Sequence, residues 1–211
     1  MSVINQLACS LGRRDQVPNR ELARQLAETE DRQGIAEIAD NLCNQDTAIQ
    51  ADCIKVLYEI GYLKPELIAP YAADFVKLLK NRNNRLVWGG MTAIATISRV
   101  AAATLYPHIE SIHKAMDSGS VITRDAGVWA LSDIAAVNPA YRSEILPYLL
   151  EHLRNCRPKD VPQHAERVVV AVRAEQKADF LQVIEKRMKD LSAPQQKRLK
   201  SVIQQTESKD N

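Results

Sequence analysis

The stretch Val121–Asn138, VITRDAGVWALSDIAAVN, decides the fold. Small and apolar residues recur in it at offsets 0, +4, +7, +8 and +11 from Thr123, the spacing of one face of a helix with 3.6 residues per turn. We call such a set a stripe, and this one consists of Thr123, Gly127, Ala130, Leu131 and Ile134. The stretch therefore predicts a helix that buries one face against a core.

The same stripe recurs along the chain at intervals of 37 or 38 residues, starting at Ile49, Leu86, Thr123 and Val161. The other stripes are Ile49, Cys53, Val56, Leu57 and Ile60; Leu86, Gly90, Ala93, Ile94 and Ile97; and Val161, Ala165, Val168, Val169 and Val172. Eleven residues before each start stands an apolar residue, which places a first helix ahead of each stripe helix: Ile38, Phe75, Ile112 and Leu150. A period of this length predicts an array of stacked helix pairs.

The array organises the whole chain, residues 1–211, as one α-solenoid domain of about five to six helix pairs. Residues 33–175 hold the repeats, 1–32 form terminal cap helices, 176–205 form a last helix pair, and 206–211 form a polar tail that we expect to fray. Within the cap we expect a helix over residues 2–11 that stops near Gly12, and a second helix capped by Asn19.

Short polar segments at 44–46, 81–84, 117–120 and 157–160 are predicted to be the turns between helices. Three prolines recur in the predicted first helices, at Pro70, Pro107 and Pro147. They predict a shared bend or a shared helix start. Inside the stripe helices, Gly90 is predicted to allow close helix approach.

Composition favours a soluble cytoplasmic protein. The net charge is +2, and the longest apolar runs fall short of the ~20 residues that span a bilayer. The charges near the N-terminus follow its apolar part, the wrong order for a secretory signal. The cysteines form no CxxC pair, so we interpret them as reduced thiols: Cys9, Cys43, Cys53 and Cys156.

The helix-pair length, the proline and the stripe spacing together resemble HEAT repeats, most clearly between Gln33 and Val172. The resemblance implies an all-α, right-handed superhelix of antiparallel pairs, with the second helices lining a concave face. It also implies binding of proteins, or sometimes of nucleic acid, and seldom catalysis. Units of the family usually carry an Arg just after the stripe start, which pairs with acidic residues along the stack. Only Arg124 matches this position, so we do not expect a ladder of ion pairs between the repeats of this chain.

The sequence contains none of the common catalytic or nucleotide-binding motifs. The chain lacks GxGxxG, a phosphate loop, GxSxG and HExxH, so we predict no catalytic, cofactor-binding or metal-binding residue and no enzyme. His108 and His113 are five residues apart, which points them to different sides of a helix. All four histidines are interpreted as solvated helix residues, the other two being His152 and His164.

The side chains that project between the stripes of the second helices are the candidate partner-binding residues: Tyr58, Trp88, Met91, Thr92, Asp125, Trp129 and Asp133. Both tryptophans of the chain are among them. Tryptophan and tyrosine are frequent interface anchors. The alternative, that Trp88 and Trp129 fill gaps between neighbouring second helices, stays open.

These features favour a non-catalytic scaffold that binds a protein or peptide segment carrying apolar anchors and Lys or Arg. A second hypothesis is a nucleic-acid-binding protein of the DNA alkylation-repair type, suggested by the Trp–Asp grouping. Two basic groups could meet phosphates: Lys77, Lys80, Arg82 and Arg85, and Lys186, Arg187, Lys189, Lys197, Arg198 and Lys200. The acidic groove has the wrong sign for phosphate, however. A third hypothesis, a chromophore-lyase-like accessory protein, has no specific residue behind it.

Overall fold

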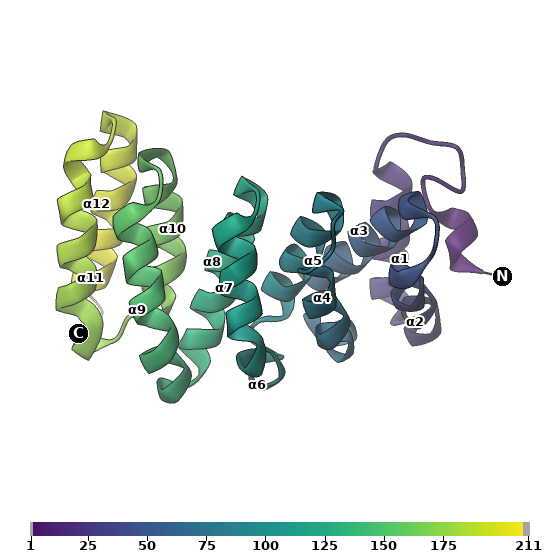
Figure 1. The fold of residues 1–211 in the computed structure, drawn as a ribbon, viewed down its shortest axis with the longest axis horizontal. Helices are drawn as coiled ribbons and strands as arrows, with labels where there is room; N and C mark the ends of the chain where they lie inside the picture. Colours follow the sequence, from purple (N-terminus) through teal and green to yellow (C-terminus); the bar gives the residue numbers. More distant parts are fainter. Residues whose placement is uncertain (1, 209–211) are drawn as a thin grey trace. The chain divides into compact units, whose positions relative to one another are not determined.

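The structure is a computed structural model that describes residues 2–208. Throughout this range the regular elements are α-helices and 3-10 helices, without a strand, which confirms the all-α prediction (Figure 1). The chain divides into two compact units, Met1–Ala130 and Leu131–Asn211, and each is described by itself. No helix among residues 2–208 combines the length and the apolar character needed to cross a membrane.

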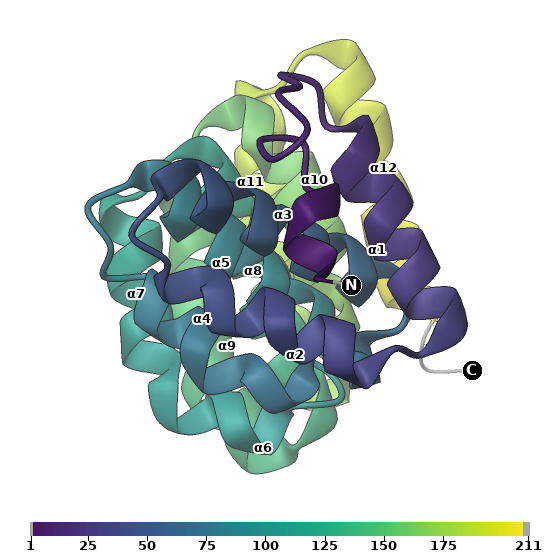
Figure 2. The same cartoon turned by 90° about the vertical axis from the view of Figure 1, so that its right-hand side faces the viewer.

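The first unit is built of helix pairs. Its second helices α1, α3 and α5 follow one another side by side, while α2 packs on α3 and α4 packs on α5 (Figure 2). The helices are α1 (Val17–Thr29), α2 (Arg32–Asp40), α3 (Thr47–Leu63), α4 (Ala72–Leu78), α5 (Asn84–Ile97), α6 (Ala102–Leu105), α7 (Ile109–Ser118) and the first part of α8 (Val121–Val137).

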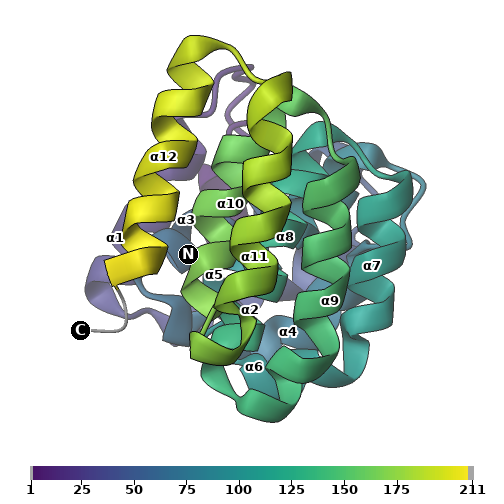
Figure 3. The ribbon, with the colours of Figure 1, turned by 90° about the vertical axis from the view of Figure 1, so that its left-hand side faces the viewer.

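The second unit repeats the arrangement. The helix α9 packs on α10 and α11, and α12 packs on α10 and α11 (Figure 3). After the end of α8, its helices are α9 (Pro139–Asn155), α10 (Val161–Val168), α11 (Ala174–Arg187) and α12 (Ala193–Glu207). The predicted last pair, 176–205, is therefore present as α11 and α12.

Two of the predicted polar turns supply side-chain caps that start second helices. The Asp46 carboxylate accepts a hydrogen bond from the Ala48 amide at 2.7 Å and caps α3. The Asn83 side chain accepts one from the Arg85 amide at 2.9 Å and caps α5. Such bonds satisfy amides that have no partner inside the helix, which is why Asp and Asn stand at these turns.

The stripes form the core. Every stripe residue is buried except Ile49, which is half-buried, and the four first-helix residues Ile38, Phe75, Ile112 and Leu150 are buried as well. Burying one Leu, Ile or Val side chain contributes roughly 1.5–3 kcal/mol. The recurrent stripe is therefore the main source of stability within each unit.

Glycines at stripe offset +4 allow close helix approach. A Cβ on Gly90 would lie 2.9 Å from the Leu78 Cβ and 3.1 Å from the Phe75 carbonyl oxygen, both on α4. A Cβ on Gly127 would lie 2.3 Å from the Met116 Cγ of α7. The predicted role of Gly90 is confirmed.

Both chain ends differ from the prediction. Only Val3–Gln6 is helical within residues 2–11, as a 3-10 turn. Gly12 adopts a left-handed conformation, with φ 66°. Asn19 does not cap a helix, because α1 already begins at Val17 and Asn19 is buried inside it. Its Oδ1 instead accepts a hydrogen bond from the Ala8 amide at 2.9 Å, tying the N-terminal segment to α1.

At the other end α12 continues through Thr206 to Glu207, and Thr206 is buried, so the predicted fraying does not begin at Thr206. The rest of the predicted tail, 209–211, lies outside the described residues. Two of the three prolines stand in 3-10 turns that lead into first helices, Pro70 before α4 and Pro107 before α7. Pro147 lies inside α9, so the three prolines do not share one role.

Candidate functional site: an aromatic cluster on the second helices

Four aromatic side chains from three second helices of the first unit touch one another. The Tyr58 ring lies 6.1 Å from that of Trp88 and 6.2 Å from that of Tyr62, between ring centroids. The Tyr62 ring stacks on Trp129 at 5.9 Å, with an interplanar angle of 18°. We call Tyr58, Tyr62, Trp88 and Trp129 the aromatic cluster. It runs from α5 through α3 to α8.

Helix spacing brings the cluster together. Tyr58 and Tyr62 are four residues apart, so both lie on one face of α3. Trp88 and Trp129 stand at offsets +2 and +6 of their stripes, on the same side of α5 and α8 as the predicted groove. The result is a continuous aromatic surface made by three repeats.

The cluster has a buried base and an exposed edge. Tyr58 is 7% exposed and Tyr62 is 54% exposed, while the two tryptophans are half-buried. Trp88 and Trp129 thus pack between second helices and also present part of their surface to solvent. Both interpretations left open by the sequence describe part of their environment.

Charged side chains around the cluster are paired within the chain. The Lys55 ammonium lies 4.6 Å from the Tyr58 ring centroid and forms a salt bridge with Glu59. Burial alone would lower the pKa of Lys55, but the hydrogen bonds to Glu59 and Tyr58 outweigh it and raise that pKa. Burial raises the pKa of Tyr58, so its phenol stays neutral near pH 7.

A second ion pair joins α3 and α5. Asp52 is 4% exposed, lies 3.9 Å from the Arg85 guanidinium, and accepts a hydrogen bond from the Cys9 amide at 2.8 Å. Asp52 therefore ties the N-terminal segment to α3. The Asp52 carboxylate therefore has both a cationic partner and a hydrogen-bond donor within the chain.

Three of the predicted partner-binding residues are buried and lie outside the aromatic cluster. Met91 is fully buried, because α3 and α4 both pack on α5 and enclose it. Thr92 is 7% exposed, and its hydroxyl donates to the Trp88 carbonyl at 2.8 Å. Asp133 is 8% exposed and belongs to the second unit. Asp125 is half-buried.

Tyr62 is the cluster residue that the stripe pattern missed. It stands at offset +13 from Ile49, beyond the last stripe position, +11. The sequence feature that could have identified Tyr62 is its i, i+4 spacing from Tyr58, because residues at this spacing share one face of a helix.

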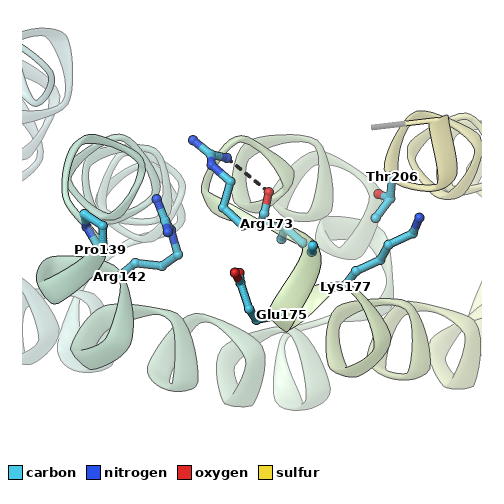
Figure 4. Close-up of a pocket in the computed structure, with 8 residues that line it drawn as sticks. Pro139, Arg142, Arg173, Glu175, Lys177 and Thr206 are labelled. Carbon is cyan, nitrogen blue, oxygen red and sulfur yellow. Dashed lines mark hydrogen bonds between the residues drawn. The ribbon is translucent and has the colours of Figure 1, made fainter. Parts of the chain in front are cut away.

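The second unit contains a cavity of about 680 Å³, lined by Pro139, Arg142, Val172, Arg173, Ala174, Glu175, Lys177 and Thr206 (Figure 4). Arg173 donates to the Val170 and Val172 carbonyls at 2.9 and 3.1 Å, and Lys177 donates to the Glu207 carbonyl at 3.1 Å. Burial, followed by the charge of Arg173, lowers the pKa of Arg142. The lining has three cationic side chains and one anionic side chain, and two of the cations, Arg173 and Lys177, donate to carbonyls at helix ends.

Two histidines of the second unit are not solvated helix residues. His164 of α10 is 1% exposed, and its Nδ1 lies 3.1 Å from Nε2 of the half-buried His152 of α9. The prediction is wrong for this pair, because it treated each histidine on its own helix. The fold of α9 against α10 brings the rings together.

Comparison with known proteins supports the fold. No protein-family model and no curated protein matches the sequence. An engineered protein matches at a TM-score of 0.69 and 20% identity, over 99% of this chain and 98% of that chain. A designed armadillo repeat protein in complex with peptide (KR)4 matches at 0.69 and 17%, over 96% and 99%.

The karyopherin Kap121p, bound to the extreme C-terminus of the protein phosphatase Cdc14p, matches at a TM-score of 0.63 and 14% identity, over 90% of this chain and 21% of that chain. These likenesses show the fold. The chain has an armadillo- and HEAT-like repeat fold, an α-solenoid, as the stripes predict.

Proposed function

We propose that this protein is a non-catalytic scaffold that binds an extended segment of a protein partner, with the aromatic cluster as the anchor. One observation carries the proposal. Both tryptophans of the chain and two tyrosines form one partly exposed surface across three second helices. Aromatic residues with partly buried rings offer a large contact area at little loss of side-chain entropy.

The ligand class follows from the rings and their neighbours. The chain's own Lys55 lies over the Tyr58 ring, so one ring of the cluster already accepts a cation. We propose that a partner contributes apolar side chains to the exposed edge at Tyr62 and Lys or Arg side chains to the ring faces. Two structural neighbours, the designed armadillo repeat protein with its (KR)4 peptide and Kap121p with the C-terminus of Cdc14p, support a peptide ligand.

Nucleic acid is the second hypothesis, and the charges near the cluster favour it less. Lys55 is paired with Glu59, and Arg85 lies 3.9 Å from Asp52. Elsewhere Lys77 pairs with Asp74, and Arg198 pairs with Glu166. A phosphate backbone needs cations that are not already neutralised. We therefore place the peptide hypothesis first.

The test is fluorescence anisotropy with three labelled peptides on the full chain: (KL)4, which alternates Lys and Leu, (KR)4, and (EL)4. We expect (KL)4 to bind most tightly and (EL)4 least, with a moderate loss of affinity in salt. A labelled single-stranded oligonucleotide tests the second hypothesis in the same assay.

The variant for this assay is Tyr62→Ala, and its matched control is Leu11→Ala, because both side chains are 54% exposed and Leu11 is outside the cluster. If Tyr62 is a hot spot, its truncation should cost about 2 kcal/mol of affinity. Equal binding of (KL)4 and (EL)4, or equal losses in the two variants, would contradict the proposal.

A further inference from the structure

Three side chains with metal-ligating atoms meet in the second unit, outside the aromatic cluster. They are His152 on α9, Cys156 directly after α9, and His164 on α10. Their candidate ligand atoms all lie within 4.8 Å of one another. The closest pair, Nε2 of His152 and Nδ1 of His164, is 3.1 Å apart.

The sequence places these groups for a reason. His152 and Cys156 are four residues apart, so they share the face at the C-terminal end of α9. The turn that contains the 3-10 segment Pro158–Asp160 returns the chain, and α10 then packs on α9 with His164 buried one turn inside it. The cluster therefore joins both helices of one repeat.

The spacing fits a tetrahedral transition-metal ion. Zinc–nitrogen bonds of about 2.0–2.1 Å at tetrahedral angles separate two imidazole nitrogens by about 3.3 Å, and a thiolate sulfur from a nitrogen by about 3.6 Å. The 3.1 Å between the two histidine nitrogens is close to the first distance. The Cys156 Sγ lies within 4.8 Å of both nitrogens and 3.8 Å from the Leu153 carbonyl oxygen, and it has to move closer to the nitrogens to reach the second distance.

A half-buried arginine holds the ligand-bearing turn in place. The Arg187 guanidinium donates to the carbonyls of Leu153, Arg154 and Cys156 at 2.6, 2.8 and 2.8 Å. It is itself held by Asp190 at 3.0 Å. Burial raises the pKa of the Cys156 thiol, and the positive charge of Arg187 works against that rise. Outer groups of this kind commonly fix ligand orientation and tune metal sites.

We propose that His152, Cys156 and His164 bind one divalent ion of the zinc class, through two neutral imidazoles and one thiolate. The ion takes the place of the hydrogen bond between the two rings. The donor imidazole loses its shared proton and takes up another at its other ring nitrogen, so both rings stay neutral and no net proton leaves them. Cys156 loses its thiol proton to solvent, so one proton is released per ion. Three protein ligands leave a fourth position for water or an outside ligand. His152 and Cys156 are half-buried, which keeps that position accessible.

The experiment is titration of the metal-free full chain with Co²⁺, which reports both geometry and sulfur ligation. We expect a thiolate-to-cobalt charge-transfer band and tetrahedral visible bands that saturate at one equivalent. Zn²⁺ should displace the cobalt with loss of both bands. Zn²⁺ should also raise the Tm, because it binds the folded state preferentially.

Cys156→Ser should abolish the charge-transfer band, and His152→Gln should weaken Co²⁺ binding at least about tenfold. Cys43→Ser is the matched control, because Cys43 is an exposed thiol of the first unit, and it should leave the spectrum unchanged. Circular dichroism verifies that the variants are folded. Absence of bands at saturating Co²⁺, or a charge-transfer band that survives Cys156→Ser, would overturn the proposal.

Discussion

The indole of Trp129 stacks on the phenol of Tyr62, with ring centroids 5.9 Å apart and planes inclined by 18°. The two rings come from α3 and α8, second helices of different repeats. A stacked aromatic pair contributes about 0.5–1.5 kcal/mol beyond its buried area. Tyr62 therefore stabilises the first unit and also forms the exposed edge of the proposed binding surface.

Tyr62→Ala should uncover one tryptophan and not the other. We expect acrylamide quenching of Trp129 to increase, because the ring that covers it is gone, and that of Trp88 to change little, because Trp88 contacts Tyr58. Each indole is measured alone in a Trp88→Phe or a Trp129→Phe background. Equal increases in both backgrounds would show that the stack does not shield Trp129 specifically.

Leu131→Ala should destabilise the protein by about 2–5 kcal/mol, since Leu131 is fully buried at stripe offset +8. In a repeat array each repeat contacts its neighbours, so the loss should also reduce the cooperativity of unfolding. Urea denaturation followed by circular dichroism measures both effects. Leu63→Ala, at a position 54% exposed, is the control. A Leu131→Ala protein as stable as this control would mean that the stripe is misassigned.

Gly90→Ala should lower the free energy of unfolding by about 1–3 kcal/mol, because the added methyl group would overlap α4. Helix propensity alone would favour alanine by about 1 kcal/mol, so the expected sign depends on packing. Gly89→Ala is the matched control: the nearest neighbours of its Cβ are atoms of the Ile54 side chain, the closest at 3.0 Å, so it should be tolerated better. A more stable Gly90→Ala protein would contradict the close approach of α4 and α5.

The thiols should react with iodoacetamide in the order of their exposure. Cys43 is exposed and should be labelled first, and Cys53 is fully buried and should be labelled last. Burial raises the pKa of Cys53, so the folded state holds almost no Cys53 thiolate at neutral pH, and its labelling must await unfolding. Mass spectrometry of timed samples gives the order. Labelling of Cys53 as fast as Cys43 in the folded protein would contradict the core assignment.

The repeated stripe made the fold predictable. The stripe recurs every 37 or 38 residues, and each copy packs in the same way. Leu57, Ile94, Leu131 and Val169, all at offset +8, are therefore all buried although the repeats differ in sequence. The chain ends were predicted less well. Asn19 is a residue type that often caps helices, but here its side chain accepts a buried hydrogen bond from the Ala8 amide. This contact joins two segments of the chain, and the local sequence pattern does not predict it.

The candidate site was predicted only in part, because the sequence pattern describes one helix at a time. Offsets along one helix identified Trp88, Trp129 and Tyr58, but they could not separate Met91, which neighbouring helices enclose. The pairing of His152 with His164 also depends on how α9 and α10 pack. Contacts between helices require the tertiary arrangement, and spacing along one helix does not supply it.

The central claim, that the aromatic cluster binds a partner segment, is tested most directly by the two indole N–H signals in a ¹H–¹⁵N correlation spectrum. The chain has two tryptophans and both lie in the cluster, so these two signals report the site alone. On titration with (KL)4 we predict saturable shifts of both signals, reduced by added salt and absent with (EL)4. If both indole signals stay unmoved while backbone signals elsewhere shift to saturation, the peptide binds at another surface and the claim is wrong.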